Sequence, residues 1–177
     1  MQNRPKFRAV LYFCSMKTKN TTSNCYFSNR ITVPIEIVKL EDNSYHLIIQ
    51  GEIEGIKGEM IIDTGASVSV IDKALLTEKW EDKNGCTIQS GSVSGQIEHV
   101  ELLVADYLKI GGRKLKNTSF AAIDLKYVNE MYEQRLKRKV IALLGSDFFV
   151  RYQAIIDYST LKLTLKLNPQ IKKQSPK

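Results

Sequence analysis

The most constraining feature of this sequence is a strand-like run that ends directly at an acidic residue. Residues 59–62 are predicted to form a continuous strand, and Asp63-Thr64-Gly65 follows it. A strand that is apolar on both faces is typical of a buried position, where an ionisable side chain is rare. Thr64 can form a lateral hydrogen bond, and Gly65 allows a close backbone approach that a Cβ would prevent. The pattern predicts a loop that projects one carboxylate from a rigid strand end and leaves room for a second backbone.

Short apolar segments separated by Gly, Asn and Ser recur along the chain, which predicts mainly β structure. Between residues 124 and 139 the apolar residues recur at helical spacing, so we expect an amphipathic helix there. Shorter helices are expected over 73–79 and from Ser146, as N-cap, to Tyr152. The predicted strands cover residues 45–50, 59–62, 68–71, 87–90, 97–104, 107–110, 114–123, 140–144, 153–156 and 161–167.

The charge of the chain lies mainly at its ends. The net charge is +7, and residues 1–30 hold six basic side chains and no acid, while residues 162–177 hold five lysines and no acid. Residues 31–161 therefore carry a net charge of −4. A nucleic-acid groove needs basic residues clustered on a folded face, and the internal cluster is limited to Arg135 and residues 137–139. We expect no nucleic-acid partner, although binding through the basic ends stays open as an alternative.

Composition excludes several other classes of protein. With 43% hydrophobic residues, 10 Gly and 4 Pro among 177 residues, the chain can build a core and is not fibrous. No apolar run approaches about 18 residues, so we expect no membrane partner. The chain has an odd number of cysteines, and their spacing is not that of metal ligands (Cys14, Cys25 and Cys86). Its two histidines, His46 and His99, are far apart in the sequence. We therefore expect no metal, no cofactor and a cytoplasmic location.

One carboxylate on such a loop cannot carry out hydrolysis alone. Two carboxylates about 3 Å apart cannot both ionise, so they share one proton. One can then draw a proton from water while the other protonates the carbonyl oxygen of a scissile amide. The sequence has one Asp-Thr-Gly, and the near echo at Asp157 lacks both the Thr and the Gly. The second carboxylate must therefore be Asp63 of a second copy of the chain.

Three segments in this order resemble those of the retropepsin-like (clan AA) aspartic peptidases, which are single-domain homodimers. They are the Asp-Thr-Gly-Ala-Ser loop at 63–67, the Gly-bearing hairpin at 91–95 and Leu-Leu-Gly-Ser-Asp-Phe-Phe at 143–149. The resemblance covers roughly residues 44–167. It implies an all-β, closed acid-protease barrel with one short helix in the C-terminal half, here with an inserted amphipathic helix near 124–139.

The resemblance also implies a domain plan and an activity. Residues 1–30 would be a flexible basic leader, 31–167 the peptidase domain and 168–177 a basic tail. The activity would be that of an aspartic endopeptidase, with a polypeptide substrate and a homodimer as its partners. The alternative is a catalytically inactive module that binds peptides or supports assembly on the same fold.

Residue roles follow from the same resemblance. Asp63 would be the catalytic carboxylate, Thr64 would bond to the loop of the partner copy, and Gly65 would hold the turn. The flap that closes over the substrate would be Gly91, Ser92, Val93, Ser94 and Gly95.

Less specific interpretations of these and other residues remain open. Asp63 could simply cap a turn by accepting hydrogen bonds from the following amides, and residues 91–95 could be a surface turn. Asp147 is expected to be a charge favoured by the N-terminus of its helix. Asp72 is expected to cap the helix at 73–79, and His99 to be a surface imidazole.

Overall fold

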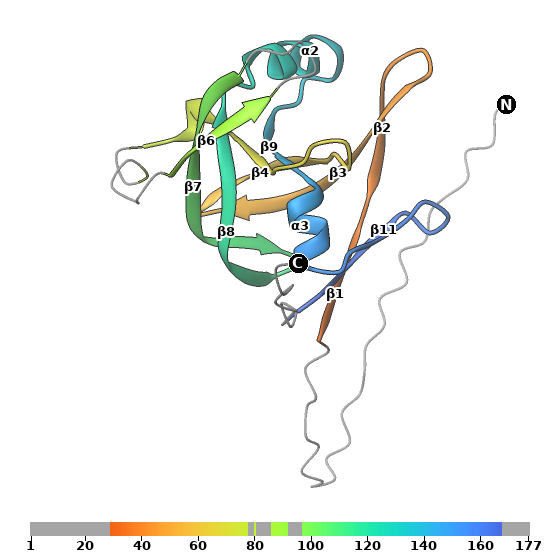
Figure 1. Cartoon of the computed structure of the whole chain (residues 1–177). Helices are drawn as coiled ribbons and strands as arrows, with labels where there is room; N and C mark the ends of the chain where they lie inside the picture. Colours follow the sequence, from red (N-terminus) through yellow and green to blue (C-terminus); the bar gives the residue numbers. More distant parts are fainter. Residues whose placement is uncertain (1–28, 78–79, 81–85, 92–96, 168–177) are drawn as a thin grey trace, which may run out of the picture.

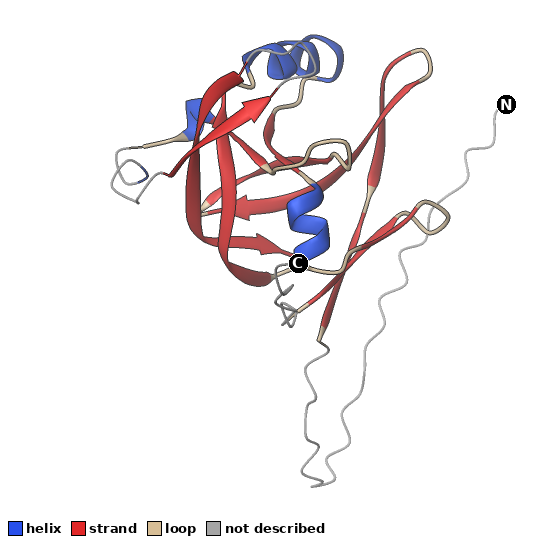
Figure 2. Cartoon of the chain, viewed as in Figure 1, coloured by secondary structure: helices blue, strands red, loops and turns tan. Residues whose placement is uncertain are grey.

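Strands dominate the computed structural model, which describes residues 29–77, 80, 86–91 and 97–167. The helical elements that these residues form are few and short (Figure 2). In chain order the elements are β1 (Arg30–Pro34), β2 (Glu36–Glu41), β3 (Ser44–Ile53), β4 (Ile56–Ile62), β5 (Val70–Asp72), η1 (Lys73–Leu75), β6 (Cys86–Gly91), β7 (Ile97–Ile110), β8 (Arg113–Ile123), α2 (Lys126–Leu136), β9 (Val140–Leu144), α3 (Ser146–Arg151), β10 (Ile155–Asp157) and β11 (Lys162–Lys166).

Six strands close into a barrel in the order β3-β4-β9-β5-β8-β7 (Figure 1). Pairing of β3 with β7, at Glu52 with Lys109 and at Ile53 with Leu108, completes the ring. The β4–β9 and β5–β8 pairs are parallel, and the other pairs in the ring are antiparallel. Strands β2 and β6 extend the sheet at its two edges. The predicted closed, mainly β barrel is confirmed.

Successive side chains of a strand point alternately into the barrel and away from it. In β4, Met60 and Ile62 belong to the main core, whereas Ile61 points to the outer face and packs in a second cluster with Tyr132. Each fully buried aliphatic or aromatic side chain contributes about 1.5–3 kcal/mol relative to an exposed one, so the closed barrel is a rigid support. The core side chains exposed by 1% or less include Ile53, Met60, Ile71, Leu103, Leu108, Ile110, Phe120, Leu144, Leu163 and Leu165.

The two ends of the described chain meet in a second sheet of order β1-β11-β10. Strand β1 runs antiparallel to β11 over its whole length, and the two lie side by side in Figure 1. Ile31 and Val33 of β1 are buried in the main core. A Cβ on Gly111, in the β7–β8 turn, would lie 2.6 Å from Ile31 Cγ2, so glycine allows this sheet to close against the turn. The sheet was only partly predicted, because no strand was expected over residues 30–41.

Helix α2 confirms the predicted amphipathic helix and covers the outer face of the barrel. Its Tyr132 is fully buried, and the helix ends where Lys137 adopts the left-handed conformation with φ of 57°. The apolar neighbours of Tyr132 are Val38, Leu40, Ile48, Ile61 and Val140.

Two predicted elements were wrong in detail. Strand β7 is continuous where two strands, 97–104 and 107–110, were predicted, because Ala105 and Tyr107 both pair with β8. The expected helix over 73–79 is a 3₁₀ turn, Lys73–Leu75, within the described residues. Its predicted cap is confirmed, since the Asp72 carboxylate accepts a hydrogen bond from Ala74 N at 3.1 Å. Among the described residues, none of the helices has the length and apolar character required to cross a membrane.

Candidate active site

The Asp63 loop, residues 63–69, starts where two parallel strands of the barrel end. The backbone N–H of Asp63 donates to the carbonyl of Leu144 at 2.9 Å and so continues the β4–β9 pairing by one residue. Ile62 and Leu144, the last residues of these strands, are buried. The apolar run therefore acts as predicted, because it holds the next residue, an acid, at a fixed strand end.

The two oxygens of the Asp63 carboxylate differ in their contacts. Oδ1 accepts hydrogen bonds from Gly65 N at 3.0 Å and from Ala66 N at 3.2 Å. Oδ2 has no hydrogen bond to any residue that the structure describes. Asp63 is half-buried, while Thr64 and Gly65 at the apex of the loop are exposed. The local contacts of a turn cap are therefore present, and they still leave one carboxylate oxygen and the loop apex open to another molecule.

The turn between β9 and α3 supports this loop from behind. Ser146 N donates to the carbonyl of Ala66 at 2.8 Å, and Asp147 N donates to that of Ser67 at 3.3 Å. Ser146 Oγ donates to the carbonyl of Thr64 at 2.8 Å. The prediction that Ser146 caps α3 was wrong: Gly145 occupies the N-cap position, and the Ser146 hydroxyl binds the loop instead.

Gly145 allows the turn to approach the loop this closely. A Cβ at this position would lie 2.7 Å from the carbonyl carbon of Val68 and 2.9 Å from Ser69 N. Real Cβ atoms essentially never approach backbone atoms to under 3.0 Å. The φ angle of Gly145 is −95°, which any residue can adopt, so space rather than backbone conformation requires glycine here.

Ser69 and Asp147 form a pair that the sequence did not predict. Asp147 Oδ1 accepts from Ser69 Oγ at 2.7 Å and from Ser69 N at 2.9 Å, while Ser69 Oγ accepts from Gly145 N at 3.0 Å. Asp147 does lie in the first turn of α3, as expected, but its carboxylate binds the loop. A signal was available, because Ser69 lies between Val68 and Val70 and a buried hydroxyl needs a partner.

Other predicted site residues are placed only in part. Gly91 ends β6 and pairs with Ile97, so the expected hairpin is present, but residues 92–96 and the side chain of His99 lie outside the described residues. Asp157 lies in the second sheet, where hydrogen bonds from Ser159 and Thr160 hold the pKa of its carboxyl well below the usual range.

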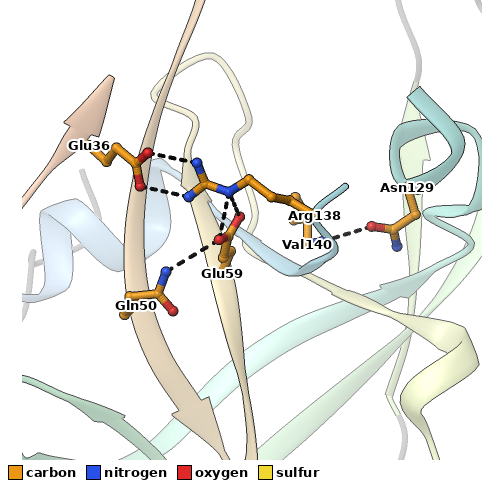
Figure 3. A network of polar contacts seen from close by, with 6 residues as sticks. All are labelled: Glu36, Gln50, Glu59, Asn129, Arg138 and Val140. Atoms are coloured by element: carbon orange, nitrogen blue, oxygen red, sulfur yellow. Dashed lines mark hydrogen bonds and ion pairs between the residues drawn. The ribbon is translucent and has the colours of Figure 1, made fainter. Parts of the chain in front are cut away.

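A charged network lies at the middle of β4. Arg138 Nε donates to both carboxylate oxygens of Glu59, and its two Nη atoms donate to Glu36 at 2.7 and 2.6 Å (Figure 3). The same guanidinium holds the pKa of Glu36 below its usual value. Close by, Asn129 of α2 accepts from Val140 N at 2.8 Å. The network joins β2, β4 and the α2–β9 connection, and so it stabilises the strand that precedes Asp63.

Among the residues that the structure describes, no three His, Cys, Asp or Glu side chains are gathered where they could hold a metal ion. A cavity of about 610 Å³ lies beside α2, and its lining includes Asp72 and Lys139. It is lined by side chains of both charges and by no residue of the Asp63 loop.

Comparison with known proteins identifies the family. The sequence model described as Aspartyl protease matches residues 49–148, which is more than half of the chain and includes both the Asp63 loop and Gly145. The chain belongs to the aspartyl protease family. The resemblance to aspartic peptidases predicted from the sequence is thereby confirmed.

Two solved structures of proteases are similar to this member of the aspartyl protease family. A retropepsin-like aspartic protease from Rickettsia conorii has 18% sequence identity and a TM-score of 0.44, with 78% of this chain and 89% of that chain covered. The Simian Foamy Virus (mac) protease has 17% identity and a TM-score of 0.41, with 58% of this chain and 91% of that chain covered. No curated protein matches the chain.

Proposed function

We propose that this member of the aspartyl protease family is an aspartic endopeptidase that hydrolyses peptide bonds as a homodimer. The observation that carries the proposal is the setting of Asp63. Its carboxylate is held at the end of two buried strands, with Oδ1 bonded to its own loop and Oδ2 unbonded among the described residues. A single carboxylate cannot act as acid and base in one step, so a second copy must supply the other.

In the proposed reaction, the two Asp63 carboxyl groups of the dimer share one proton. The ionised carboxylate takes a proton from a water molecule, whose oxygen forms a bond to the carbonyl carbon of the peptide. The protonated carboxyl gives its proton to the carbonyl oxygen. When the C–N bond then breaks, a proton passes to the leaving nitrogen, and the products are a carboxylic acid and an amine.

The remaining site residues have supporting roles in this proposal. The Thr64 side chain, at the exposed apex of the loop, has no hydrogen bond to any described residue and would bond to the loop of the partner copy, while Gly65 keeps the turn compact. Gly91, Ser92, Val93, Ser94 and Gly95 would form the flap that excludes water and clamps an extended polypeptide substrate.

The direct test measures cleavage of denatured casein by the full-length wild-type chain and by its Asp63→Asn variant. We expect the wild-type protein to cleave casein and the variant to have no activity while keeping the wild-type circular dichroism spectrum and melting temperature. Asp157→Asn is the matched control, since it removes the other acid that follows two isoleucines, and it should still cleave. Cleavage by Asp63→Asn would refute the proposal.

A second candidate function is favoured by the hydrogen bonds that Oδ1 of Asp63 accepts from Gly65 N and Ala66 N. These are the contacts of a structural turn cap, which an inactive module that binds peptides on the same fold would also keep. That candidate predicts binding of an extended peptide without turnover. Sedimentation separates the two further, because a monomer at micromolar concentration would favour the inactive module.

A further inference from the structure

We propose that Ser69 and Asp147 are positioning residues for the reaction, and that their hydrogen-bonded pair holds the Asp63 loop in its reactive conformation. The inference rests on the proposed function, but it concerns residues outside the Asp-Thr-Gly segment. Neither residue would touch the substrate. Each would act through the loop that carries Asp63.

The geometry places Ser69 at the centre of a local network. Its side chain is fully buried and uses both of its hydrogen-bonding capacities, donating to Asp147 Oδ1 at 2.7 Å and accepting from Gly145 N at 3.0 Å. Its backbone N–H also donates to Asp147 Oδ1 at 2.9 Å, and its carbonyl accepts from Ala121 N at 2.8 Å. Ser69 thereby joins the end of the loop to two separate segments of the chain, the β9–α3 turn and β8.

The same short segment that binds Ser69 also binds the start and middle of the loop. Leu144, Ser146 and Asp147 contribute backbone hydrogen bonds to Asp63, Ala66 and Ser67, respectively. Removing the Ser69 hydroxyl would leave the buried Gly145 N–H without its partner, because water does not reach a fully buried position. The loop would have to shift to relieve this loss, and small displacements of a catalytic group lower the rate of chemistry far more than they lower binding.

The test uses the full chain with Ser69→Ala and measures kcat and KM on denatured casein well below the melting temperature. We expect kcat to fall at least about tenfold and KM to change by less than about twofold. Asp147→Ala should behave in the same way. Asp147→Asn should recover most of kcat, because the amide oxygen of Asn can still accept both hydrogen bonds from Ser69.

Ser159→Ala is the matched control, because the chain repeats the arrangement far from the site. Ser159 Oγ and N donate to Asp157 Oδ1 at 2.6 and 2.8 Å, as Ser69 does to Asp147. The control should keep kcat and KM within about twofold of the wild type, whereas a general effect of losing such a pair would lower kcat in both variants.

Hydrogen exchange of the peptide that contains residues 63–69 gives a readout that does not depend on activity. We expect exchange to be about tenfold faster in Ser69→Ala and unchanged in Ser159→Ala. If wild-type protein cleaves casein and Ser69→Ala keeps its kcat, the inference is overturned while the proposed function stands. If wild-type protein does not cleave casein, the proposed function is refuted. Independently of activity, hydrogen exchange that is unchanged in Ser69→Ala would refute the role of the pair in holding the loop.

Discussion

Gly145→Ala adds one methyl group at the point where the β9–α3 turn approaches the Asp63 loop. The new Cβ would lie 2.7 Å from the carbonyl carbon of Val68, whereas ordinary contacts begin at 3.4 Å, so the two segments must separate by about 0.7 Å. The neighbouring hydrogen bond from Ser146 N to the carbonyl of Ala66 is 2.8 Å long, and the same shift would stretch it to about 3.5 Å. The methyl group therefore displaces the loop and weakens its support at once.

Overpacking of this kind costs about 2–3 kcal/mol of the free energy of unfolding. For a chain of 177 residues this corresponds to a melting temperature lower by about 4–12 °C, measurable by differential scanning calorimetry. In the proposed reaction, a displacement of this size should also reduce kcat on denatured casein by about 10- to 100-fold at a temperature where the variant is folded.

Gly112→Ala provides the comparison, because a Cβ there would meet nothing within 4 Å. Its φ of 78° makes alanine strained, so we expect a loss of about 1 kcal/mol in the free energy of unfolding and no change in kcat. The reasoning would be refuted if Gly145→Ala kept the wild-type melting temperature, or if the two variants lost activity equally.

Two further predictions concern stability. Arg138→Ala should lower the free energy of unfolding at pH 7 by about 1–2 kcal/mol in urea denaturation, since Glu36 and Glu59 lose their partner and Glu36 is largely exposed. Arg138 lowers the pKa of Glu36 from 4.5, so this contribution is fully present above pH 4.5 and is lost as the pH falls below it. A difference between variant and wild type that does not shrink as the pH falls below 4.5 would contradict the assignment. Tyr132→Phe removes a 2.6 Å hydrogen bond to His46 Nδ1 and should cost about 1 kcal/mol. Burial raises the pKa of Tyr132 to about 12, so the free energy of unfolding of the wild-type protein should fall between pH 10 and 12. In an ultraviolet absorbance titration, the variant should lack the tyrosine that titrates near pH 12.

Local sequence patterns predicted the elements around the site well. The strand before Asp63, the helix near 124–139 and the Gly145 turn all follow from residue spacing within a short window. The predictions failed where pairing with a distant strand decides the outcome. A break was expected between residues 104 and 107, but β7 continues through Asp106 because residues on both sides of it pair with β8. The capping role given to Ser146 failed for the same reason, because the hydroxyl found an acceptor 82 residues earlier in the chain, at Thr64.

The sequence by itself determined the strand that ends in an acid, the single Asp-Thr-Gly and the turn of two leucines and a glycine, because these depend on neighbouring residues and on backbone geometry. Only the tertiary structure decided which side chains support that acid. The pairing of Ser69 with Asp147 and the contact of Gly145 with Val68 each join positions more than 70 residues apart. Such contacts arise from the closure of the barrel, which sets the distances between its strands, and no pattern within one segment of the chain specifies them.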